Sequence, residues 1–379
     1  MFYNDFQGLK LSALGLGTMR LPVTDGDNSK IDMAATAEMV DYAIKNGINY
    51  FDTAWGYHGG NSEIAIGKVL SAYPRESYYL TSKFPGFVTS NFEKKEEIFA
   101  KQLEKCEKDY FDFYLFHNVC EQNIEEYLNE KYGLREWFLS LKRDGKIRHI
   151  GFSVHGDYEV TRRFLDMYGD ICEFCQIQLN WFDYSFQDAK SKIDLLRERN
   201  IPFFVMEPLR GGSLVNLAPK NKERLAGVHP EMSIPEWSFR YLETFDDCIV
   251  TLSGMSNLTQ LKENIATFEK KAPLTEGDVD ILYELADAIT KENNVPCTAC
   301  RYCTEKCPMG LDIPNLISLY NEYTYTGGGF LAPMRISSLP EEKRPSACLG
   351  CRACEEVCPQ CIKISEVLEA FSGKLSKKK

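Results

Sequence analysis

The sequence predicts an eight-stranded parallel α/β barrel of the (β/α)8 TIM type, followed by a small, mostly α-helical, cysteine-rich domain. Short apolar runs alternate eight times with amphipathic segments. The alternation extends over about 260 residues, close to the roughly 250 residues of such barrels. Cysteine is unevenly distributed, because nine of the 14 cysteines lie after residue 296, which indicates a second domain.

The alternation identifies the elements one by one. The expected strands are the apolar runs 12–16, 50–52, 78–81, 113–116, 147–152, 175–179, 202–206 and 248–252. The expected helices are the segments 34–45, 62–70, 96–105, 135–143, 158–167, 189–197, 234–242 and 259–268. Strands that alternate with helices indicate βαβ units and a parallel sheet. An open doubly wound sheet is the alternative, but segment 15–20 lacks the third glycine of its G-x-G-x-x-G fingerprint.

Composition and charge narrow the class of protein. The 379 residues carry a net charge of −11 and are 44% apolar, which is typical of a globular domain and disfavours a nucleic-acid binder. No apolar run of about 18 residues is long enough for a membrane span, and the N-terminus does not resemble a signal peptide. We therefore expect a cytoplasmic protein whose clustered cysteines bind metal rather than form disulfides. The expected domains are the barrel at 1–275, a joining helix at 276–292 and the cysteine-rich domain at 293–379.

Polar side chains follow three neighbouring strands of the predicted barrel. Asp52 ends the second strand, and Tyr57 follows five residues later. Lys83 follows the third strand and His117 the fourth. Active sites of such barrels lie at the carboxyl ends of the strands, so these four residues are the candidate catalytic group.

The motif residues resemble those of one superfamily. The segment Phe-Asp-Thr-Ala-Trp-Gly-Tyr at 51–57, Ser-Glu at 62–63, Gly-Phe-Ser at 151–153 and Glu-Asn at 263–264 resemble the pattern of the aldo-keto reductases, in order, across residues 10–268. The resemblance implies reduction of a carbonyl by hydride transfer, or oxidation of the alcohol, with Tyr57 as general acid. It implies that Lys83 lowers the pKa of Tyr57, that Asp52 holds Lys83, and that His117 orients the carbonyl. A tyrosine with a pKa near 10 needs such a neighbour to donate well at neutral pH.

The same resemblance implies a nicotinamide dinucleotide, NAD(P)(H), across the barrel mouth. Ser153 and Gln176 would contact the carboxamide. The remaining expected contacts, from the pyrophosphate loop to the adenosine end, are Leu209, Gly211, Gly212, Gly254, Gln260, Glu263 and Asn264.

Three positions depart from the family pattern. Val154 stands where the family often has asparagine, and Met206 where it often has an aromatic residue. Gln260 replaces a common arginine, and an amide cannot supply charge to a 2′-phosphate. These departures leave NADH, NADPH and a flavin as alternative hydride carriers.

The cysteine-rich domain contains one motif twice. Each copy reads C-x2-C-x2-C-x3-C-P, which is the bacterial ferredoxin pattern for [4Fe–4S] clusters, and the fourth cysteine of each copy binds the other cluster. Zinc is the alternative, but its sites lack this triple spacing. The expected ligands are Cys297, Cys300, Cys303 and Cys358 for one cluster and Cys348, Cys351, Cys354 and Cys307 for the other. Cys361 has no place in the pattern, and the separation of the two copies resembles helical ferredoxins of anaerobic oxidoreductases.

Two functions of different classes remain open. The first is an oxidoreductase acting on a small carbonyl or alcohol, with clusters that carry electrons to or from a ferredoxin or another redox protein. The second is an electron-transfer subunit whose barrel is only a docking scaffold. Because the Asp52, Tyr57, Lys83 and His117 set is complete, the sequence favours the enzyme.

Overall fold

The chain folds into two compact units in the computed structural model, which describes residues 1–376. The first unit extends from Met1 to Asp280 and the second begins at Ile281. The division falls inside helix α12 (Glu276–Asn293), the helix that the sequence predicts at 276–292. The proposed domain limits therefore stay a prediction. Among the described residues, no helix combines the length and the apolar character that crossing a membrane requires.

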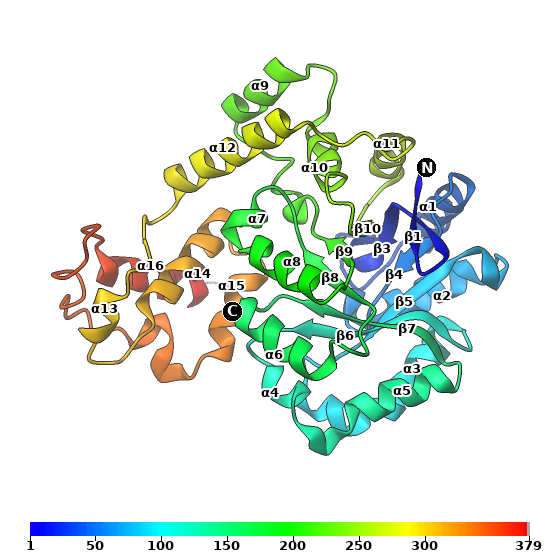
Figure 1. Ribbon diagram of the computed structural model, residues 1–379, viewed down its shortest axis with the longest axis horizontal. Coiled ribbons are helices and arrows are strands. Elements are labelled where there is room, and N and C mark those ends of the chain that lie inside the picture. Colours follow the sequence, from blue (N-terminus) through cyan, green and yellow to red (C-terminus); the bar gives the residue numbers. More distant parts are fainter. Residues whose placement is uncertain (377–379) are drawn as a thin grey trace. The chain divides into compact units, whose positions relative to one another are not determined.

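The first unit is a closed barrel of eight parallel strands (Figure 1), as predicted. Neighbouring strands follow chain order, and the last pairs with the first through Ser253 and Leu16. The strands are β3 (Leu14–Gly17), β4 (Tyr50–Asp52), β5 (Tyr79–Phe84), β6 (Phe111–Val119), β7 (Ile147–Val154), β8 (Phe174–Gln178), β9 (Phe203–Met206) and β10 (Cys248–Ser253).

One helix after each strand covers the outside of the barrel, also as predicted. These helices are α1 (Met33–Lys45), α2 (Ser62–Leu70), α3 (Lys95–Cys106), α5 (Leu134–Arg143), α6 (Tyr158–Tyr168), α8 (Ala189–Glu198), α10 (Ile234–Leu242) and α11 (Leu258–Thr267). Predicted helix limits agree with them to within one residue. Four strands, β5, β6, β7 and β10, are longer than predicted. Of these, β5 continues through Lys83 to Phe84, and β6 continues through His117 to Val119. Lys83 and His117 therefore belong to strands and not to the loops after them.

An N-terminal hairpin that the sequence did not predict closes one end of the barrel. It consists of β1 (Tyr3–Phe6) and β2 (Leu9–Ser12). Phe6 is buried, and its ring lies 5.6 Å from Phe113 and 5.9 Å from Phe174, which come from β6 and β8. The catalytic candidates stand at the opposite, carboxyl ends of the strands.

Three further helices of the first unit were not predicted: α4 (Ile124–Tyr127), α7 (Asp183–Phe186) and α9 (Pro219–Val228).

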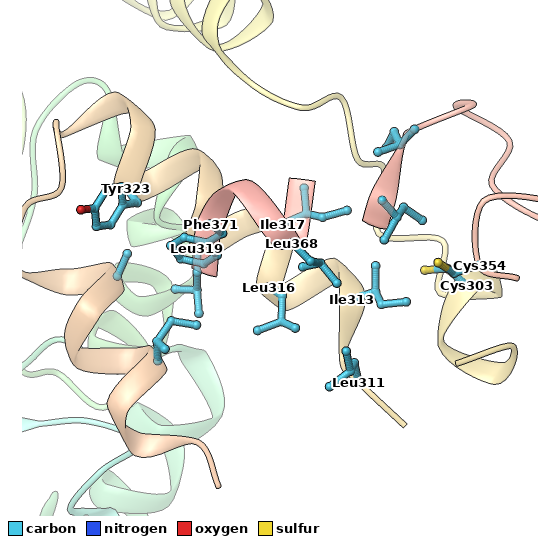
Figure 2. Close-up of a cluster of buried hydrophobic side chains, with 14 residues drawn as sticks. Cys303, Leu311, Ile313, Leu316, Ile317, Leu319, Tyr323, Cys354, Leu368 and Phe371 are labelled. Carbon is cyan, nitrogen blue, oxygen red and sulfur yellow. The ribbon is translucent and has the colours of Figure 1, made fainter. Parts of the chain in front are cut away.

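The second unit is helical, as predicted. Its helices are α13 (Tyr302–Glu305), α14 (Ile313–Tyr325), α15 (Leu331–Ser338) and α16 (Ile364–Ser376). Leu316, Leu368 and Phe371 lie in one apolar cluster between α14 and α16 (Figure 2). Figure 2 also shows Cys303 beside Cys354 at the end of this cluster away from Phe371.

We predict that packing at Gly67 on α2 is essential to the barrel. A Cβ at this position would lie 2.3 Å from the backbone oxygen of Cys106, which cannot move without shifting α3. Gly67→Ala should therefore lower the free energy of unfolding by about 1–3 kcal/mol. The matched control is Gly227→Ala on α9, where no atom lies within 4 Å. That change should be neutral or stabilise by about 0.5–1 kcal/mol.

All four tryptophans lie before residue 281, so tryptophan fluorescence during urea denaturation reports on the barrel alone. Equal effects of the Gly67 and Gly227 substitutions would contradict the prediction.

Candidate active site and cysteine cavities

A buried ion pair forms the base of the site. The Nζ atom of Lys83, at the end of β5, lies 2.6 Å from Oδ1 of Asp52, at the end of β4. Both side chains are almost fully buried. Lys83 also donates a hydrogen bond of 2.8 Å to the backbone oxygen of Thr53. With two oxygen partners, the ammonium group is fixed in position beneath the barrel mouth.

Tyr57 and His117 complete the predicted group. Lys83 Nζ lies 3.4 Å from the Tyr57 hydroxyl oxygen and 5.0 Å from the centre of its ring. The rings of Tyr57 and His117 meet nearly at right angles, with 6.2 Å between their centres. The Nδ1 atom of His117 is buried and has no hydrogen-bond partner among the described residues. The structure therefore brings all four predicted residues together.

Burial and charge set the protonation of the group. Burial alone would lower the pKa of Lys83, but the charges of Asp52 and Tyr57 outweigh it and raise that pKa, so the ammonium stays protonated. Burial raises the pKa of Tyr57, and Lys83 opposes this without reversing it. Lys83 thus acts on the Tyr57 pKa in the expected direction, but burial outweighs it, and the pKa lies above its ordinary value in the free protein. Burial, then Lys83, lowers the pKa of His117 well below its ordinary value.

The Ser-Glu motif at 62–63 supports the site from behind. Ser62 Oγ lies 2.9 Å from Oγ1 of Thr53, whose carbonyl binds Lys83. Glu63 is fully buried and accepts a hydrogen bond of 2.7 Å from Nε2 of Gln102. The same nitrogen donates to the backbone oxygen of Lys83 at 3.0 Å. This motif therefore determines where β5 presents Lys83.

Ser153 and Gln176 are buried register partners on β7 and β8. Ser153 Oγ accepts a hydrogen bond of 2.8 Å from the Asn118 backbone. Gln176 Nε2 lies 4.0 Å from the sulfur of Met206, while its Oε1 is buried without a partner among the described residues. A buried amide oxygen of this kind is unfavourable unless a ligand donates to it. Gln176 therefore fits the predicted contact with a carboxamide.

Arg20 lies along both predicted cofactor loops, and sequence reasoning missed it. A Cβ at Gly254 would lie 3.3 Å from three carbons of the Arg20 side chain, and one at Gly211 would lie 3.1 Å from its Nη2. The Gly211 loop turns tightly, because the Gly212 amide donates to the Leu209 oxygen at 2.9 Å. An exposed guanidinium between two glycine-containing loops fits an anionic group such as a pyrophosphate.

The residues predicted for the adenosine end have other partners in the chain. Gln260 Oε1 accepts a hydrogen bond of 2.8 Å from the Ser256 backbone, and Asn264 Nδ2 donates to Ser253 Oγ at 3.1 Å. Both side chains thus stabilise the loop after β10. Glu263 is exposed on α11. Contacts of these residues with an adenosine stay a prediction.

Glu207 is a second residue that sequence reasoning missed. It follows β9 directly, has a left-handed backbone with φ of 58°, and is half-buried. Burial, then the charge of Asp183, raises the pKa of Glu207. Its charge in turn acts on Tyr57, so it faces the same site. The available signal was its place at the carboxyl end of a strand.

Each predicted cysteine set lines its own cavity in the second unit. The first cavity is lined by Cys297, Cys300, Cys303 and Cys358. The second cavity is lined by Cys307, Cys348, Cys351 and Cys354. Cys361 is exposed and lines neither cavity. Four thiols around each cavity fit the four thiolates that a [4Fe–4S] cluster takes.

The two cavities are related by an internal repeat with an offset of 51 residues, as from Cys297 to Cys348. Every residue that lines the first cavity has its repeat partner in the lining of the second. The offset also relates the limits of α14 and α16. Left-handed backbone recurs at the same places: Ala299 and Gly350, Arg301 and Arg352, Gly310 and Cys361. The repeat therefore reproduces the backbone around the thiols as well as their spacing.

We predict that His117 stays neutral between about pH 6 and 8, because a pKa below the ordinary 6.5 places its protonation at more acidic pH. NMR of histidine-labelled protein, with His117→Asn to assign the signal, measures this. In Lys83→Met the His117 signal should titrate at higher pH than in wild type, since one of the cations that lower its pKa is gone. A wild-type His117 that titrates near pH 6.5 would contradict the assignment.

Comparison with known proteins agrees with this geometry. Residues 13–287 match a protein-family model that is described as "Aldo/keto reductase family". Residues 296–363 match a second model, described as "4Fe-4S dicluster domain". The NADH-specific methylglyoxal reductase of Escherichia coli is 25% identical over 330 residues, which cover 75% of this chain and 97% of the relative. L-galactose dehydrogenase of Arabidopsis thaliana is 27% identical over 286 residues, which cover 68% and 85%.

Solved structures share the fold. The holo form of aldo-keto reductase AKR11C1 from Bacillus halodurans is 22% identical with a TM-score of 0.59, covering 75% of this chain and 96% of that one. A Klebsiella pneumoniae aldo/keto reductase in complex with NADP and acetate is 18% identical with a TM-score of 0.57, covering 75% and 95%. Since the family match extends over most of the sequence, this chain belongs to the aldo/keto reductase family and carries a 4Fe-4S dicluster domain after its barrel.

Proposed function

We propose that the barrel reduces a small carbonyl compound, or oxidises the corresponding alcohol, with Tyr57 as the general acid or base. One observation carries this proposal: the ammonium of Lys83, held by Asp52 at 2.6 Å, lies 3.4 Å from the Tyr57 hydroxyl. Reduction of a carbonyl builds negative charge on its oxygen, so a proton donor backed by a fixed cation lowers the barrier.

The residues take distinct parts in this reaction. Tyr57 stays protonated at neutral pH because its pKa is raised, and it transfers its proton to the carbonyl oxygen. Lys83 stabilises the Tyr57 phenolate that remains after this proton transfer. His117, neutral in this environment, orients the carbonyl oxygen through a hydrogen bond. Asp52 keeps Lys83 charged and in place.

The hydride carrier we propose is a nicotinamide dinucleotide, with a flavin as the alternative. Either group, when bound, would supply the hydride. Gln176 and Ser153 would meet the carboxamide, and Arg20 would meet the pyrophosphate between the Gly211 and Gly254 loops. A relative that covers 75% of this chain is described as NADH-specific, and Gln260 lacks the charge that a 2′-phosphate prefers, so NADH is the first candidate.

The eight cysteines around the two cavities would hold two [4Fe–4S] clusters, which carry single electrons. The hydride that a bound carrier would supply already holds both electrons that a carbonyl takes up. The clusters would therefore act on the carrier and not on the carbonyl: one electron from each would restore a flavin, which accepts single electrons, after one turnover. With a nicotinamide as carrier, the clusters would serve a separate step or partner. A ferredoxin or another one-electron redox protein is the partner that we propose for them. The proposed setting is the cytoplasm, where a thiol-ligated cluster does not compete with disulfide formation.

Tyr57→Phe should lower the rate of carbonyl reduction by about 10²–10⁴-fold, the usual contribution of a general acid. Methylglyoxal is a suitable probe, because one relative is described as its reductase. The assay should use NADH, NADPH and the chemically reduced protein as electron donors in turn. Tyr3→Phe is the control, since the Tyr3 hydroxyl bonds to Gly47 at the other end of the barrel. Unchanged activity in Tyr57→Phe would instead favour the barrel as a docking scaffold.

Arg20→Ala should raise the Kd for the dinucleotide by about 10–100-fold, because a charge-assisted hydrogen bond contributes about 1.5–3 kcal/mol. Titration of the protein with NADH, NADPH, FMN and FAD, followed by fluorescence, measures this change and identifies the carrier. Arg143→Ala is the matched control, because Arg143 lies at the end of α5, before β7 begins. Equal affinities of wild type and Arg20→Ala would argue against a pyrophosphate at this place.

A further inference from the structure

The internal repeat makes the two cysteine cavities a matched pair, and one charge at the first cavity has a direct counterpart at the second. Arg301 lines the first cavity and Arg352 the second, and both have the left-handed backbone. Arg301 pairs with Asp312 at 3.1 Å, and Arg352 pairs with Glu366 at 3.6 Å. Each cavity thus has one arginine and one partner carboxylate.

Other charges near the cavities differ between the repeats. Lys363 stands between two residues that line the first cavity, whereas its repeat partner Asp312 stands between two that line the second. Glu355 bonds to Ser365, which lines the second cavity, but its carboxylate is offset by the charges of Arg352 and Lys363.

Lys343 is a charged residue near the second cavity that has no repeat partner at the first. It belongs to segment 326–347, which lies between the two repeats and has no counterpart in them. Its half-buried ammonium donates to the backbone oxygens of Met309 at 2.8 Å and Gly310 at 3.1 Å. Both residues stand in the turn after Cys307, and Met309 lines the second cavity.

The same turn at the first cavity has no such cation in its sequence. There the repeat partners of Met309 and Gly310 are Gln360 and Cys361, which are uncharged. The two turns otherwise agree: Gly310 N donates to Cys307 O at 2.9 Å, and Cys361 N to Cys358 O at 3.0 Å. Lys343 therefore places a cation directly on one of two similar turns.

We propose that Lys343 raises the reduction potential of the cluster that the second cavity would hold. Reduction adds one negative charge to a cluster, and a nearby cation in a half-buried setting stabilises the reduced form more than the oxidised form. Cys303 and Cys354, which are repeat partners that line different cavities, are close enough for the charge of one to act on the other (Figure 2). This inference rests on the proposed two-cluster function.

The test is a redox titration of the anaerobically purified full-length protein, followed by EPR, with dithionite as reductant. Wild type should show two separable one-electron steps. Lys343→Gln keeps a donor for the two carbonyls but removes the charge, so it should move one step, that of the cluster in the second cavity, to lower potential and leave the other step in place. Lys343→Arg, which keeps the charge, should restore the wild-type pattern. Lys343 would act on the cluster through its charge and not as a ligand, so the quantity to measure is the reduction potential.

The repeat also supplies the variants that assign the step to a cavity. Arg352→Gln at the second cavity should move the same step as Lys343→Gln, and Arg301→Gln at the first cavity should move the other. Movement of both steps together in Lys343→Gln, movement of neither, or loss of iron in this variant would overturn the inference. Protein that contains about eight iron atoms and two steps, but no response to Lys343→Gln, leaves the two-cluster function intact. Protein without iron would overturn both.

Discussion

The buried ion pair between Lys83 and Asp52 is the constraint on which the active site depends. Removing one partner of such a pair leaves a buried charge uncompensated, at a cost of about 3–5 kcal/mol, so the two side chains must be placed together. They come from β5 and β4, whose register pairs Asp52 with Thr81. The pair therefore exists only where these neighbouring strands are aligned in the closed barrel, and Tyr57 can be an effective acid only beside it.

The strands, the covering helices and the grouping of the four candidate residues were predictable from sequence because they rest on local patterns. Apolar periodicity identifies a strand or a helix without its neighbours. The parallel barrel then places the ends of successive strands together, which is why Asp52, Lys83 and His117 could be grouped. The lowering effect of Lys83 on the Tyr57 pKa was predictable, but the net rise of that pKa was not, since it depends on burial as well as on charge.

The features that sequence reasoning missed depend on contacts between distant segments. The N-terminal hairpin has short strands, and Phe6 becomes a barrel residue only through rings from β6 and β8. Arg20 belongs to the candidate site only because its side chain lies beside the loops after β9 and β10, which are distant from it in sequence. The cysteine spacing predicted both ligand sets, but the repeat extends further, into α14 and α16, with similar rather than identical residues such as Ile317 and Leu368.

The most direct test of the proposed role of the ion pair replaces its cation, Lys83. Lys83→Met and Lys83→Arg should be compared with wild type for methylglyoxal reduction, with dinucleotide affinity and iron content measured on the same samples. The account predicts that Lys83→Met loses at least about 100-fold in kcat while affinity and iron content are unchanged, and that Lys83→Arg retains part of the rate. A Lys83→Met protein that works within a few-fold of wild type would contradict the central role of the ion pair.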